Sequence, residues 1–164
     1  MNSIVENSNM VHSYMGLFHV AMAILAMIIG PVVLWFPKGT QRHKKLGYTY
    51  AGAMLLLNIS AFMIYSLQGR PSMFHLFALI SLITLAAGIL PAFRKQKKKG
   101  WYQKHYYFMS WSVVGLYCAF WSETGTRLLE GQHFWWIVAL ASIITALIGM
   151  VLINRKAKQL FSKA

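Results

Sequence analysis

The sequence predicts an all-α membrane protein, a bundle of five transmembrane helices with the amino terminus outside and the carboxyl terminus in the cytoplasm. Of its 164 residues, 57% are apolar and only 12% are charged, whereas a soluble domain has about 25% charged residues. Five long stretches contain no Asp, Glu, Lys or Arg. The basic residues gather in alternate connections between these stretches, which is typical of multi-pass membrane proteins.

Each uncharged stretch is long enough to cross the bilayer as a helix, because about 20 residues rising ~1.5 Å each span a ~30 Å hydrocarbon layer. Isolated strands would leave backbone groups unpaired in lipid. The predicted helices cover residues 11–36, 48–68, 71–93, 105–124 and 134–154. The sequence contains no internal repeat or long linker, so we expect residues 1–164 to form one integral membrane domain.

The basic residues determine the predicted orientation. The first and third connections and the tail after the last helix contain nearly all of them, whereas the second and fourth connections contain only Arg70 and Arg127. Lys and Arg concentrate on the cytoplasmic side, so these three segments are predicted to lie there, at a bacterial inner membrane. The lysine run at 97–99 is expected to face anionic lipids. This explains the net charge of +13 without a nucleic-acid partner.

Small residues mark the predicted contact faces, because helices in lipid pack closely where side chains are small. On the first helix such residues recur with two histidines at alternating steps of four and three. They are His12, Gly16, His19, Ala23, Ala26 and Gly30. We expect this face to look into the bundle.

Four histidines are candidate cofactor ligands, because a titratable group inside a bilayer is usually functional. His19 and His75 lie toward the outer ends of the first and third helices, and His43 and His105 at the cytoplasmic starts of the second and fourth. An outer and an inner pair could hold two b-type haems, each between two imidazoles. A second interpretation of His43, which has basic neighbours, is an interfacial residue that meets lipid phosphate.

Glycines within the helices could admit a flat macrocycle such as haem, although the same residues also serve plain helix packing. The glycines considered for this role are Gly16, Gly52, Gly88 and Gly115.

Glu123 supports a different hypothesis, because it is the only carboxylate adjoining a membrane stretch and is predicted to lie at the level of His19 and His75. Two imidazoles and a carboxylate could bind a divalent metal ion such as zinc or iron. The same three residues could instead relay protons or recognise a solute in a small transporter. Arg127, one turn later, offers the structural alternative that Glu123 is held in an ion pair.

The sequence contains no recognisable hydrolase or transferase motif, and its three acidic residues leave little material for paired-carboxylate catalysis. Any enzymatic or redox activity would need a cofactor. The main hypothesis is a haem- or metal-binding protein in electron transfer or respiratory assembly. The alternatives are a small transporter and a structural subunit without chemistry of its own. A homo-oligomer or a respiratory partner subunit is compatible with all three.

A family resemblance rests on a basic hairpin and on the histidines. The hairpin runs from Lys38 to Tyr50, and other matching residues are His19, Gly30, Pro31, His75, His105, Tyr117 and Glu123. With these features the chain resembles a bacterial family of predicted membrane proteins of unknown function, over roughly residues 15–130. The resemblance implies a fold and a set of histidines but names no reaction. A weaker likeness, by analogy, is to four-histidine membrane proteins that assist assembly of respiratory oxidases.

Overall fold

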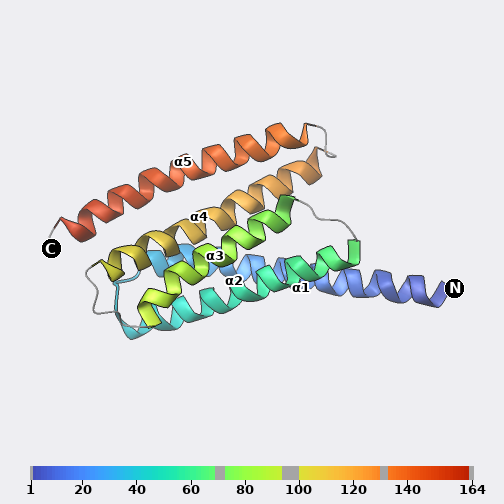
Figure 1. The fold of residues 1–164 in the computed structure, drawn as a ribbon, viewed down its shortest axis with the longest axis horizontal. Coiled ribbons are helices and arrows are strands. Elements are labelled where there is room, and N and C mark those ends of the chain that lie inside the picture. The colour runs from blue at the N-terminus through green and yellow to red at the C-terminus, as the bar shows by residue number, and fades with distance from the viewer. Residues whose placement is uncertain (1, 69–72, 94–99, 130–132, 163–164) are drawn as a thin grey trace. The chain divides into compact units, whose positions relative to one another are not determined.

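The computed structural model describes residues 2–68, 73–93, 100–129 and 133–162. Within these ranges the chain forms five helices and no strand (Figure 1). The helices are α1 (Asn2–Trp35), α2 (Gln41–Gln68), α3 (Met73–Phe93), α4 (Trp101–Leu128) and α5 (Phe134–Phe161). The predicted all-α fold is confirmed.

The helices extend beyond the uncharged stretches that predicted them. α2 begins at Gln41 rather than at residue 48, and α5 continues to Phe161 rather than ending at 154. Both extensions contain several Lys and Arg residues, which are good helix formers. A helix that has left the hydrocarbon no longer needs apolar side chains, so the uncharged stretches understate the lengths of the helices.

Four of the described helices are long and apolar enough to cross a membrane, judged by length and composition. The qualifying segments are Tyr14–Trp35, Gln41–Ile64, His75–Phe93 and Phe134–Phe161. Among the described helices, α4 does not meet this criterion, although its 28 residues are enough to cross a membrane. It carries polar side chains that are buried: Ser110, Ser112, Ser122 and Thr126. The modest hydropathy of α4 therefore comes in part from buried polar side chains.

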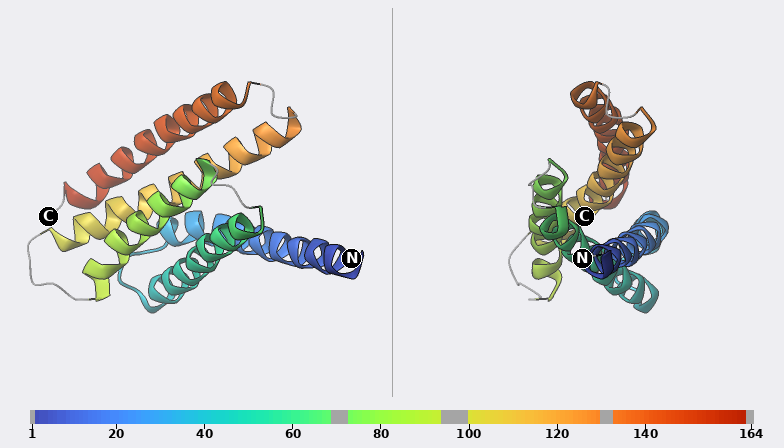
Figure 2. Two further views of the ribbon diagram at one scale, coloured as in Figure 1. Left: turned by 45° about the vertical axis from the view of Figure 1, so that its right-hand side comes forward. Right: turned by 90° about the vertical axis from the view of Figure 1, so that its right-hand side faces the viewer.

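The chain divides into two compact units, Met1–Ile83 and Thr84–Ala164. In the first unit, α1 and α2 form an antiparallel hairpin (Figure 2). At its turn, the Lys38 ammonium donates to the carbonyl oxygen of Leu34 at 2.8 Å, which satisfies an acceptor at the end of α1. The Thr40 hydroxyl oxygen accepts from the backbone N–H of His43 at 3.1 Å and so caps the start of α2.

Side-chain burial in the first unit confirms the predicted inner face of α1 over its described part. Ala26 and Gly30 are buried, whereas Leu17 and Ile28 are 68% and 62% exposed. Exposed apolar side chains of this size on membrane-spanning helices contact lipid.

A polar contact joins α2 to α3 within the same unit. The amide nitrogen of Asn58 donates to the Met54 carbonyl at 2.7 Å and contacts the Ser81 hydroxyl at 3.1 Å. Asn58 is only 4% exposed, so these bonds satisfy an amide that would be costly to bury unpaired.

In the second unit, α4 and α5 run antiparallel and side by side (Figure 1). Paired positions lie along most of α4, and they are Tyr106 with Ile153, Val114 with Gly149, Cys118 with Ser142, and Gly125 with Ile137. At Gly149 the two helices pack tightly, because an added Cβ would overlap with the methyl groups of Val114. We call this line of paired positions the α4–α5 seam.

Candidate functional site

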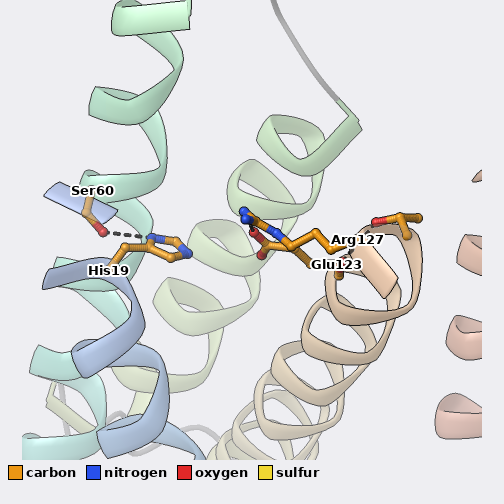
Figure 3. Close-up of polar contacts among 5 residues, drawn as sticks. His19, Ser60, Glu123 and Arg127 are labelled. Carbon is orange, nitrogen blue, oxygen red and sulfur yellow. Dashed lines mark hydrogen bonds and ion pairs between the residues drawn. The ribbon is translucent and has the colours of Figure 1, made fainter. Parts of the chain in front are cut away.

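His19 is held on α1 by a hydroxyl of α2. Its Nδ1 lies 3.0 Å from the Ser60 Oγ, as Figure 3 shows. The Ser60 hydroxyl donates its hydrogen to the Leu57 carbonyl at 2.8 Å, so toward His19 it acts as an acceptor. In this arrangement Nδ1 carries the proton, and the lone pair of the neutral imidazole is on Nε2.

His43 lies in the first turn of α2 and contacts the end of α1. Its Nδ1 is 3.3 Å from the carbonyl oxygen of Val33. A carbonyl oxygen can only accept, so Nδ1 is the protonated nitrogen here as well. The side chain is half-buried rather than fully exposed.

His105 makes the shortest of these contacts, in the second turn of α4. Its Nδ1 donates to the Gly88 carbonyl oxygen of α3 at 2.7 Å. The contact depends on a close approach of the two helices, because a Cβ on Gly88 would lie 2.7 Å from the Met109 sulfur and 3.1 Å from its backbone nitrogen. Gly88 is thus a packing position filled by Met109 and does not leave room for a macrocycle. Around the other three glycines considered for that role, Gly16, Gly52 and Gly115, an added Cβ would meet nothing within 4 Å.

His75 stands at the start of α3, with a buried Nε2 and its ring centroid 6.2 Å from that of Phe62. Phe62 follows Ser60 by two residues on α2, which corresponds to ~3 Å along the helix axis and a turn of about 200°. The rings of His19 and His75 therefore lie at nearly the same level along α2 and contact different faces of it.

His19, His43 and His105 share one feature, which is that Nδ1 lies within hydrogen-bond distance of a protein oxygen. Metal-ligating histidines usually donate their second ring N–H to a carbonyl or carboxylate, which fixes the ring and raises the basicity of the ligating nitrogen. Imidazole is a common axial ligand of haem iron.

Glu123 is held by Arg127, as the structural alternative predicts. Its carboxylate accepts from the Arg127 guanidinium at 2.5 Å across one turn of α4 (Figure 3). The arginine side chain is 77% exposed, and surface pairs of this kind contribute little to stability. The metal and carrier hypotheses both use this carboxylate, which already has a cationic partner.

No three His, Cys, Asp or Glu side chains come together to hold a metal ion among the residues that the structure describes. The predicted metal site of His19, His75 and Glu123 stays a prediction, because the last of these residues belongs to the separately described second unit.

The partners of the histidines were not predicted from the sequence. Ser60 was not among the predicted site residues, and the acceptor supplied by Gly88 is a backbone carbonyl, which no side-chain pattern reveals. A hydroxyl side chain within an apolar helix is the one signal that could have indicated Ser60, because such side chains form hydrogen bonds between membrane helices.

Residues 16–157 match the model of a family described as predicted membrane protein (DUF2306). No curated protein and no solved structure matches the chain. The match extends beyond the range of the predicted resemblance at the carboxyl end and includes α4, most of α5 and all four candidate histidines.

Proposed function

Because the chain belongs to the DUF2306 family of predicted membrane proteins, we propose that it is a multi-pass protein of a bacterial inner membrane that binds b-type haem for electron transfer. The observation that carries this proposal is the shared hydrogen bonding of His19, His43 and His105, in each of which Nδ1 contacts a protein oxygen, as the second ring nitrogen of a ligating histidine usually does. Bound haem would supply one-electron transfer.

The chain's own residues supply binding and orientation in this proposal. The Gly88 carbonyl fixes the ring of His105, the Ser60 hydroxyl fixes that of His19, and the Val33 carbonyl fixes that of His43. Each bond keeps Nδ1 protonated and so prevents a change of tautomer that would place the hydrogen on the ligating nitrogen.

The proposed topology has five crossings, with the amino terminus outside and the carboxyl terminus in the cytoplasm. It includes α4 as a transmembrane helix despite its modest hydropathy. Support comes from the seam, which runs from Tyr106 and Ile153 at one end to Gly125 and Ile137 at the other. A helix packed along a membrane-spanning partner over this length lies at the same depth, and its buried polar side chains avoid the lipid.

Cysteine labelling tests the fifth crossing. In a Cys118→Ser background, Leu129→Cys is expected to react with a membrane-impermeant maleimide in intact spheroplasts, because the end of α4 lies outside. Thr40→Cys is expected to react only after lysis, because the first connection is cytoplasmic. If Leu129→Cys, like Thr40→Cys, reacted with the maleimide only after lysis, α4 would not cross the membrane.

The haem proposal is tested by the visible absorption spectrum of protein purified in detergent from haem-replete cells, recorded oxidised and reduced. We expect a Soret band and the sharp reduced bands of a haem with two imidazole ligands. Zinc and iron contents are measured on the same sample. Stoichiometric zinc or non-haem iron without a Soret band would favour the metal hypothesis. A sample with neither a Soret band nor a bound metal would contradict both the haem and the metal hypothesis.

A further inference from the structure

A groove of about 450 Å³ opens at one end of the α4–α5 seam, between the first turns of α4 and the last turns of α5. Its lining residues are Gln103, Tyr107, Asn154, Ala157, Lys158 and Phe161. Gln103 and Tyr107 are one helical turn apart on α4, as are Asn154 and Lys158 on α5, and they continue the antiparallel pairing of the seam.

Packed aromatic rings form one wall of the groove, and the small side chain of Ala157 also lines it. The Phe161 ring stacks on Tyr107 at a centroid distance of 6.4 Å and meets the edge of Tyr106 at 5.6 Å. Ala157 is only 5% exposed and packs in a cluster with Tyr106 and Ile153. The groove therefore combines a ring surface suited to apolar groups with polar side chains at its opening.

The groove is positively charged, and no carboxylate of α4 lies near it. Lys158 supplies an ammonium, and Gln103 and Asn154 supply amide N–H donors. The carboxylate of α4, Glu123, follows Tyr107 by 16 residues, or ~24 Å along the helix axis. An anion is thus the ligand that complements this end of the second unit.

We infer that this groove binds the headgroup of an anionic phospholipid. The lipid phosphate lies at Lys158 and the two amides, and the glycerol and upper acyl chain lie along Tyr107, which is one turn closer to the bilayer than Gln103. The inference rests on the proposed topology, which places this end of α4 and α5 at the cytoplasmic membrane surface, where anionic lipids attract basic residues. It does not depend on haem.

Native mass spectrometry of delipidated protein in detergent tests the inference, with phosphatidylglycerol or phosphatidylcholine added at equal concentration. We expect more bound phosphatidylglycerol than phosphatidylcholine, and a loss of about fivefold in phosphatidylglycerol binding for Lys158→Gln. The matched control is Lys156→Gln, which removes an exposed charge from the same turn of α5 without altering the groove. It is expected to bind the lipid as the wild type does.

Equal binding of the two lipids, or equal losses in the two lysine variants, would overturn the inference. Displacement of the lipid by millimolar inorganic phosphate would instead identify a site for free phosphate and would also contradict it. The haem spectrum and the cysteine labelling pattern of Lys158→Gln are expected to match those of the wild type. Failure of the lipid site is therefore distinguishable from failure of the proposed function.

Discussion

His105→Asn is expected to abolish one of two haem spectral components while leaving the fold intact. The asparagine amide nitrogen can occupy the place of Nδ1 and donate to the Gly88 carbonyl, which now receives a bond of 2.7 Å from His105. What the substitution removes is Nε2, the proposed ligand of the iron. Optical redox titration of the purified variant should show a single remaining component.

Two further variants separate ligation from packing. His105→Leu removes both ring nitrogens, so it should lose the same component and also lower thermal stability, because the Gly88 carbonyl loses its donor. His133→Asn is the matched control, since His133 has a left-handed φ of 57° that asparagine tolerates. An unchanged two-component titration in His105→Asn would show that Nε2 of His105 is not a ligand.

Gly149→Leu is expected to disrupt the packing of α4 against α5 and to cause the largest loss of stability of any substitution considered. Even the Cβ of alanine would overlap with both methyl groups of Val114. Overpacking of this kind costs about 1–3 kcal/mol. Leucine adds three more carbon atoms at this tightly packed point of the seam, so its cost should be at the upper end of that range or above.

Gly115→Leu is the control for this prediction, because Gly115 lies on an exposed face of α4 and an added Cβ there meets nothing within 4 Å. The two variants are compared by thermal unfolding and by size-exclusion chromatography in detergent. Gly149→Leu should melt well below the wild type or aggregate, whereas Gly115→Leu should stay near it. Equal melting temperatures of all three proteins would contradict the close approach of α4 and α5.

The helical fold could be predicted from the sequence because lipid leaves the backbone few options. A stretch such as residues 134–154, without a charged side chain, has to satisfy its N–H and C=O groups internally. Helix ends were predicted less well. Outside the hydrocarbon no such constraint applies, and the basic residues after Ile153 simply continue α5 to Phe161.

The histidines could be identified as candidates from depth alone, whereas their environments could not. The tautomer of His105 is fixed by a carbonyl 17 residues away on another helix, and that of His19 by a hydroxyl 41 residues away. Contacts of this kind follow from helix packing, which depends on volumes at positions such as Gly88 and Met109. The ion pair of Glu123 with Arg127 was predictable because it is local, within one turn of one helix.

In α4, modest hydropathy occurs together with extensive packing against a neighbouring helix. By length and composition it falls below the helices that are apolar enough to span a membrane, yet it has buried polar side chains and a partner along most of its length.

Titration of haem-free protein with ferric haem is the most direct test of the proposed function. The wild type is compared with a variant in which His19, His43, His75 and His105 are all replaced by asparagine. We predict saturable binding to the wild type with a low-spin ferric signal in electron paramagnetic resonance, and loss of that signal in the variant. Binding that is identical in the two proteins, or no low-spin signal from the wild type, would contradict haem ligation by these histidines.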